Sequence, residues 1–138
     1  MMMQMEMVEC GAASLGMVLA YHKKWLPLEQ LRKDCGVSRD GCSAKQLLQA
    51  GRGYGMKATA YRLEPDDLDG LAPAIIHWNF NHFVVYCGHR GDTFYINDPA
   101  RGKQRVPRED FCKSFTGIAL DFEPTADFHP SGQRASVL

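Results

Sequence analysis

Residues 4–15 read QMEMVECGAASL, a stretch in which a glutamine, Gln4, precedes a cysteine, Cys10, that is expected to open a helix. Backbone N–H groups at a helix N-terminus are unpaired and the helix dipole is positive there, so both stabilise a thiolate. The side-chain amide of Gln4 can fold back so that, with the backbone N–H of Cys10, it points at a developing oxyanion. The stretch therefore predicts an activated cysteine nucleophile with Gln4 as its oxyanion donor.

A free cysteine in an apolar helix is more commonly a small buried hydrophobe. The neighbours of Cys10 argue against that alternative, because Glu9 and Gly11 are poor partners for a core side chain. Gly11, Ala12 and Ala13 are also small enough to let a substrate chain approach the sulfur. We therefore expect Cys10 to need a histidine from elsewhere in the fold.

Composition limits the class of protein. The chain has 138 residues, 45% of them hydrophobic, which is enough for one domain with a core of its own. Sixteen basic residues balance sixteen acidic ones, so no nucleic-acid partner is expected. No signal peptide or membrane span is evident, which predicts a cytosolic domain.

The five cysteines include no C-x-x-C pair, which argues against a disulfide scaffold and against a zinc site. We expect no metal and no cofactor. Cys35, Cys87 and Cys112 are predicted to be buried thiols, and Cys42 to lie in a loop.

A helical first half and a stranded second half predict an α+β fold, with N-terminal helices packed on an antiparallel sheet and the site between them. Helical spacing and capping signals predict three helices, from Cys10 to about Lys24, from Pro27 to Gly36, and from Ser43 to the glycines at 51–55. Strand patterns predict six strands, at 56–63, 74–78, 82–88, 92–97, 104–106 and 117–122, with a helix at 107–115.

His82 is the predicted partner of Cys10, because it begins an apolar strand just after the polar loop 79–81. If residues 89–91 form a three-residue hairpin loop with a left-handed Gly91, His82 lies directly opposite Asp98. Val84 then pairs with Ile96 and Tyr86 with Phe94 on the same face, with opposing side chains about 5 Å apart. The register predicts a carboxylate that orients an imidazole.

Asp98 has a second interpretation, because Asn97-Asp98-Pro99 is a turn signature in which the aspartate caps its own backbone. The registration against His82 favours the catalytic role, since a buried carboxylate fixes the tautomer that frees the other ring nitrogen. The two roles are compatible. His77 is a weaker candidate for the base.

With these motifs in place, the chain resembles the peptidase domain of bacteriocin-processing ABC transporters, a papain-like cysteine protease family that cuts leader peptides after a double-glycine motif. The resemblance covers residues 4–123. Its markers are Gln4 with 9–11 and Ala13, then 82–85, then 97–99, in the family's order. Segments 36–41, 74–83 and 114–117 most resemble the branch serving lanthipeptide and nitrile-hydratase-like leaders.

The resemblance implies a role for each site residue. Cys10 attacks the carbonyl of the second glycine, His82 is base and then acid, Asp98 orients His82, and Gln4 stabilises the oxyanion. The resemblance also implies that an amphipathic leader helix docks on the surface of the domain and that a narrow channel accepts the small pair. We expect Gly11, Trp78 and Asn79 to line this channel. Trp78 and Phe80 are equally compatible with the core.

Full proteins of this family continue into transmembrane and ATP-binding domains. We therefore expect residues 1–125 to be the peptidase domain and residues 126–138 to be a tail or linker outside the core, leading to the transmembrane domain. In that context the domain would lie on the cytosolic face of the bacterial inner membrane. Its partners would be a precursor peptide and the transporter domains.

Two other functions remain open from the sequence. Some transporter domains of this fold lack the cysteine and only bind the leader, although Cys10 argues against this for the present chain. A transglutaminase or deamidase would use the same triad on another amide, and a channel too narrow for side chains would discriminate against it. A purely structural domain would not require Gln4, Cys10, His82 and Asp98 to converge.

Overall fold

A six-stranded antiparallel sheet organises the molecule, with the strand order β1-β6-β2-β3-β4-β5. The computed structural model describes residues 2–134, with side chains described from Glu9 onward. The strands are β1 (Met56–Arg62), β2 (Ala74–Trp78), β3 (His82–Arg90), β4 (Thr93–Asp98), β5 (Gly102–Pro107) and β6 (Phe115–Pro124). All six predicted strands are present, with bounds that differ by a few residues at most.

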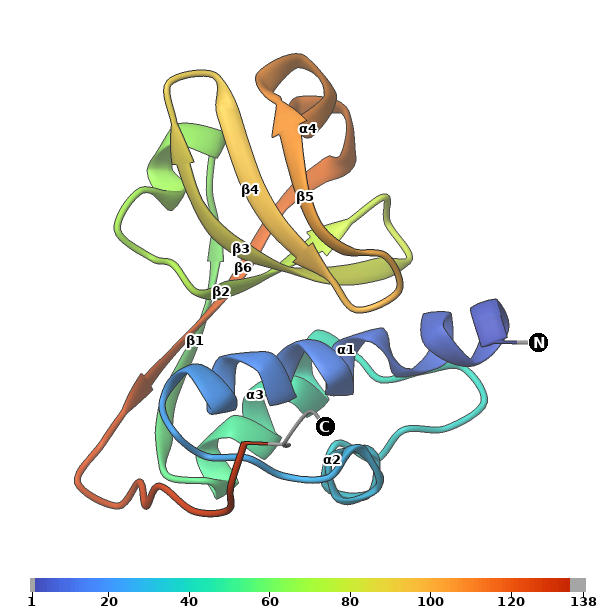
Figure 1. Ribbon diagram of the computed structural model, residues 1–138, viewed down its shortest axis with the longest axis vertical. Helices are drawn as coiled ribbons and strands as arrows, with labels where there is room; N and C mark the ends of the chain where they lie inside the picture. Colours follow the sequence, from blue (N-terminus) through green and yellow to red (C-terminus); the bar gives the residue numbers. More distant parts are fainter. Residues whose placement is uncertain (1, 135–138) are drawn as a thin grey trace.

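Helices lie on both sides of this sheet. They are α1 (Met2–Tyr21), α2 (Leu28–Asp34), α3 (Ala44–Gly53) and α4 (Arg108–Ser114), with a short 3₁₀ helix η1 (Pro65–Leu68) before β2. In Figure 1, α1, α2 and α3 lie together at the bottom of the view, level with the lower parts of β1 and β6, and α4 lies at the top next to β5. Ser43 caps α3 as predicted, in a reciprocal capping box with Gln46. The α+β prediction is confirmed.

The start of α1 differs from the prediction. The helix was expected to begin at Cys10, but it begins at Met2, so Cys10 lies in its interior. The backbone N–H of an interior residue is already bonded within the helix. The helix dipole stabilises negative charge mainly at the first turn, and Cys10 lies beyond that turn. Helix-terminal stabilisation of the Cys10 thiolate, and the Cys10 N–H as an oxyanion donor, are therefore not supported.

Two apolar clusters occupy the two faces of the sheet. The first joins α1, α2 and α3 to the sheet and includes Leu15, Leu47, Phe83 and Phe122. The second lies under η1 and α4. Its buried members are Leu68, Ile76, Trp78, Val84, Tyr86, Phe94, Ile96, Phe111, Phe115 and Ala119. The alternation of β3 residues between the clusters follows from the two-residue period of a strand.

The β3–β4 hairpin differs from the predicted register. Its loop has two residues, because Arg90 pairs with Thr93, and Gly91 is left-handed as predicted. Past a bulge between Tyr86 and Gly88, Tyr86 pairs with Ile96 instead of Phe94. Extending that register by one more pair places Asp98 two residues along β3 from His82, not directly opposite it. The two residues are therefore diagonal neighbours on one face.

The segment after β6 returns to the helical layer. Phe128 packs against the first apolar cluster, and the Trp25 N–H donates to the Ser131 carbonyl at 2.9 Å. The expectation that residues from 126 onward lie outside the core is therefore wrong for Phe128. Residues 135–138 of the predicted tail lie outside the described residues.

Two cysteines also differ from expectation. Cys87 and Cys112 are exposed, whereas Cys35 is buried as predicted. Cys42 is half-buried in the loop before α3.

Candidate active site

Cys10 lies on the face of α1 that packs against β3, with 4% of its surface exposed. The backbone N–H of Phe83 donates a hydrogen bond to Cys10 Sγ at 3.3 Å. One helical turn along, Ser14 Oγ donates to the Phe83 carbonyl at 3.4 Å. Both polar groups of the Phe83 backbone therefore hold β3 against α1, and one of them stabilises negative charge on the sulfur.

His82 and Asp98 form the predicted pair. His82 is the first residue of β3 and Asp98 the last residue of β4. Nε2 of His82 lies 2.8 Å from Asp98 Oδ1, and both side chains are largely buried. The same Oδ1 accepts the Ala100 N–H at 2.8 Å, so Asp98 also caps its turn. The two interpretations of Asp98 are thus both present in the structure.

The electrostatics of His82 favour its protonated form. The pKa of His82 is raised to about 9, first by its hydrogen bond with Cys10 and then by Asp98, while burial opposes the shift. Because Nε2 is bonded to Asp98, Nδ1 is the ring nitrogen left free to interact with Cys10. An imidazolium at neutral pH is a natural partner for a thiolate.

Gln4 lies in α1, but its side chain lies outside the described residues. Its predicted role as oxyanion donor stays a prediction.

Gly11 is buried, and its small size has a structural cause. A Cβ at this position would lie 2.7 Å from Cys42 Sγ and 3.2 Å from Leu47 Cδ1. The absence of a side chain therefore allows the loop before α3 to pack on α1 beside Cys10. Burial and the nearby Cys10 raise the pKa of Cys42 to about 11, so Cys42 stays a neutral thiol at physiological pH. Lining of a substrate channel by Gly11 stays a prediction.

Trp78 and Asn79 differ in what they can offer a substrate. Trp78 is 8% exposed and packs edge-on against Phe111, 5.3 Å between ring centroids, so most of its ring belongs to the second cluster. Asn79 is exposed in the turn before His82, and its N–H donates to the Ser114 carbonyl at 2.8 Å. Asn79 thus remains open to a substrate, whereas Trp78 is almost entirely buried.

His77 is not arranged as the base. Its Nδ1 lies 3.1 Å from Thr116 Oγ1, and its ring contacts the rings of Phe80 and Phe83. Burial lowers the pKa of His77, so it is neutral at physiological pH.

Two contributors were not found from the sequence. The Phe83 N–H is a backbone donor, and no residue type marks such a group. Glu9 is buried beside Cys10 and pairs with Arg32 Nε of α2 at 2.8 Å. The signal for this pair was Glu9 itself, because a charged residue needs a partner when it is buried.

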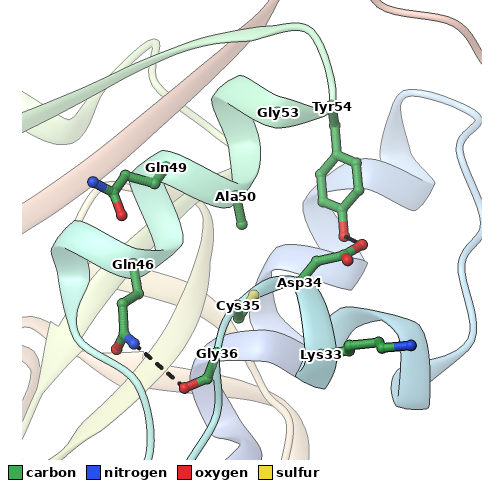
Figure 2. Close-up of a pocket in the computed structure, with 9 residues that line it drawn as sticks. All are labelled: Lys33, Asp34, Cys35, Gly36, Gln46, Gln49, Ala50, Gly53 and Tyr54. Carbon is green, nitrogen blue, oxygen red and sulfur yellow. Dashed lines mark hydrogen bonds between the residues drawn. The ribbon is translucent and has the colours of Figure 1, made fainter.

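A pocket between α2 and α3 does not involve Cys10, His82 or Asp98. Figure 2 shows its lining, in which the Gln46 side chain donates to the Gly36 carbonyl. The Tyr54 hydroxyl donates to Asp34 there, and the pKa of Cys35 is raised to about 12, mainly by burial. The lining residues are Lys33, Asp34, Cys35, Gly36, Gln46, Gln49, Ala50, Gly53 and Tyr54. With no histidine and a thiol that stays protonated, this pocket lacks the groups for nucleophilic catalysis.

A helix-borne cysteine, a strand-borne histidine and a carboxylate behind it are the arrangement of a papain-like cysteine peptidase. Residues 1–127 match the model of the peptidase C39 family. The chain belongs to this family.

Relatives and solved structures agree with this assignment. The chain is 35% identical over 135 residues, 97% of its length, to the probable microcin-H47 secretion/processing ATP-binding protein of Escherichia coli. It is 36% identical over 126 residues, 91% of its length, to the colicin V secretion/processing ATP-binding protein of the same species. It covers 19% and 18% of these relatives, so it spans about a fifth of their length.

One solved structure has a higher sequence identity to this chain than these two relatives. The crystal structure of a double glycine motif protease from an AMS/PCAT transporter, in complex with the leader peptide, is 62% identical. The match covers 86% of both chains with a TM-score of 0.82.

Among residues 2–134, no helix is both long enough and apolar enough to cross a membrane.

Proposed function

We propose that this chain is a cysteine endopeptidase that removes leader peptides from ribosomally made bacteriocin or lanthipeptide precursors. The bond cleaved would be the one directly after a double-glycine-type pair, Gly-Gly or Gly-Ala. The observation that carries the proposal is the linked set of Cys10, His82 and Asp98, held between α1 and the β3–β4 hairpin. The 62% identity to a double glycine motif protease supports the choice of substrate.

The proposed reaction assigns one role to each site residue. The Cys10 thiolate attacks the carbonyl carbon of the second small residue, and the oxyanion that forms is stabilised by the Gln4 amide. His82, protonated at Nδ1, donates that proton to the leaving amide nitrogen. The neutral His82 then removes a proton from water, which hydrolyses the thioester and restores Cys10. Asp98 keeps the ring oriented through Nε2 in both steps.

The restriction to small residues would come from the approach to Cys10. Gly11 follows Cys10 in the chain, Asn79 lies in the turn before His82, and Trp78 is the last residue of β2 before that turn. A channel closed to anything larger than a methyl group would admit Gly-Gly and Gly-Ala and would exclude pairs with bulkier side chains.

The setting proposed for the chain is the peptidase domain of an ABC transporter on the cytoplasmic side of the membrane. The two relatives of Escherichia coli are named secretion/processing ATP-binding proteins, and the chain covers about a fifth of each. The partners would be a precursor peptide with an amphipathic helical leader and the transmembrane and ATP-binding domains of the transporter.

The first test uses mass spectrometry of peptides that share one leader and differ in the pair before the scissile bond. We expect cleavage after Gly-Gly and Gly-Ala, no cleavage after bulky pairs, and none at all by Cys10→Ala. Leader binding, measured by fluorescence anisotropy, should change less than about twofold in Cys10→Ala, because the substitution removes one buried sulfur and no surface contact.

Binding without cleavage by the wild-type chain would instead identify a recruitment module. Loss of both binding and cleavage in Cys10→Ala would mean that the substitution disturbs α1, not only the chemistry.

A further inference from the structure

Phe80 stands out among the described residues. It is 79% exposed, the most exposed of the large apolar side chains, and lies in the turn 79–81 directly before His82. Its backbone is left-handed, with φ 64°, next to a left-handed Asn79 with φ 53°. Asparagine tolerates that conformation, whereas a bulky residue adopts it at a cost in free energy. Burial does not repay this cost at Phe80, because most of its ring faces solvent.

The turn is held in a fixed position by its neighbours. Trp78 and His82 pair across its base, and the Asn79 N–H is bonded to the Ser114 carbonyl. The Phe80 ring meets the His77 ring edge-on, with 6.4 Å between centroids. These contacts hold the ring in a defined place and leave most of it free for another molecule.

The ring lies on the same side of the sheet as the Cys10 sulfur. His77 and Phe83 are direct cross-strand partners with rings 5.2 Å apart, so their side chains share a face. Phe83 belongs to the same cluster as Cys10 and donates its N–H to Cys10 Sγ. Phe80, resting on His77, therefore extends this aromatic surface outward from the buried site.

The reaction chemistry decides which part of a substrate meets this surface. The acid that protonates the leaving nitrogen must lie on the side of the released peptide, so His82 marks that side of the scissile bond. The turn that carries Phe80 is the backbone immediately before His82. Phe80 is two residues before His82 in this turn, so its exposed ring is within reach of the residue whose nitrogen accepts the proton.

We infer that Phe80 is a specificity-determining residue that contacts the first residue of the released peptide and favours an apolar or aromatic side chain there. The inference rests on the proposed function and adds a preference on the far side of the cut, separate from the leader and the small pair. His77 supports the apolar character of the surface, because burial lowers its pKa and leaves it uncharged at neutral pH.

The test uses peptides with one leader and a Gly-Gly pair, followed by Phe, Leu, Ser or Asp. For the wild-type chain we expect kcat/KM about fivefold higher with Phe or Leu than with Ser, the size of a modest apolar contact. Phe80→Asn removes the ring but tolerates the left-handed backbone, and it should reduce this preference to less than about twofold. Phe80→Tyr should keep the preference, because the ring remains.

Two controls separate this role from others. Tyr21→Ala removes another exposed aromatic, at the far end of α1, and should leave all rates unchanged. Replacing an apolar leader residue by Ala should raise KM by the same factor in wild type and in Phe80→Asn, since the two contacts are independent. Circular dichroism melting checks that each variant is folded.

Three results would overturn the inference: a wild-type chain without the preference, a preference that survives in Phe80→Asn, or an equal loss for all four peptides in Phe80→Asn. Failure of the proposed function gives a different result, since the wild-type chain would then cleave none of the peptides.

Discussion

At the scale of single residues, His82 links the sulfur of Cys10 to the carboxylate of Asp98. Its pKa of about 9 means that the ring carries its proton at neutral pH and loses it as the pH rises through that value. The form that can donate a proton to the leaving nitrogen is therefore the form present below about pH 9.

Replacing Asp98 by Asn tests this account. Asp98 raises the pKa of His82 through a hydrogen bond and its charge, so Asp98→Asn should lower it. The basic limb of kcat/KM, expected near pH 9 in the wild-type chain, should then move to lower pH. At neutral pH we expect kcat to fall by about tenfold, equivalent to about 1.4 kcal/mol. The measurement is a pH profile with a double-glycine peptide.

The matched control is Asp92→Asn. Asp92 is an exposed carboxylate of the same hairpin, bonded to Arg108, and its removal should leave the limb in place. A limb that stays near its wild-type position in Asp98→Asn would show that Asp98 does not set the pKa of His82.

The pairing of His82 with Asp98 could be predicted although the register was wrong. The observed pairing beyond the bulge is shifted by two residues from the expected one, and a shift of two keeps every side chain on its face. His82 and Asp98 can contact each other only if their side chains lie on the same face of the sheet. A histidine ring is long enough to reach a diagonal neighbour on that face. The sequence predicts that a helix N-terminus stabilises the Cys10 thiolate, and this prediction is wrong because α1 begins at Met2. The residues before Cys10 include no clear capping residue that would mark this start.

At the scale of elements, the bulge in β3 has a consequence for the site. Near the loop the register differs from the expected one by three residues, since Phe94 faces His89 instead of Tyr86. An odd shift carried to the end of the hairpin would turn Asp98 to the opposite face from His82. The extra residue at Cys87 reduces the shift to two and returns Asp98 to the face of His82. The sequence signal for this bulge is Gly88, whose φ is 118°, because a glycine inside a strand is compatible with a bulge without fixing its position.

The packing of α3 on the sheet gives a prediction with an internal control. Gly51 is buried, and a Cβ there would lie 2.5 Å from Cε2 of Phe122, a core ring that has little room to move. Gly51→Ala should therefore lower the free energy of unfolding by about 1–3 kcal/mol. Gly53, two residues along the same helix, has nothing within 4 Å of its ideal Cβ. Gly53→Ala should raise stability by about 0.5–1 kcal/mol, because alanine favours the helix.

Urea unfolding at equilibrium measures both variants, and the opposite signs are the essential result. If Gly51→Ala were as stable as Gly53→Ala, α3 would not be packed against Phe122 as closely as the structure describes.

At the scale of the whole molecule, the site lies where the helical layer meets the curved sheet, and the two layers are joined again at the other end of α1. There the segment after β6 crosses back to the residues that follow α1. Lys24 Nζ donates to the His129 carbonyl at 2.9 Å, and its ammonium lies 5.8 Å from the centroid of the Phe128 ring. Composition predicted a polar tail here, because one aromatic residue among polar ones carries no periodic signal.

Truncation distinguishes a tail from a structural segment. We compare a chain that ends at residue 125 with one that ends at residue 134, so the difference reports residues 126–134 alone. The shorter chain loses the Phe128 contact and the hydrogen bonds between Ser131 and residues 23–25. We expect it to be less stable by about 1–2 kcal/mol, a decrease in Tm of about 5 °C in a thermal melt.

Activity should respond differently from stability in this experiment. His22, where α1 has just ended, is twelve residues beyond Cys10, or about 18 Å along a helix, so the lost contacts do not reach the site. Well below the Tm, kcat/KM on a double-glycine peptide should be equal for the two chains. Equal melting temperatures would mean that the peptidase domain ends at residue 125, as predicted from the sequence, and that the residues after it are a linker. A loss of activity in the folded shorter chain would instead mean that the C-terminal end of α1 positions Cys10 against His82. Residues 126–134 would then be needed for catalysis.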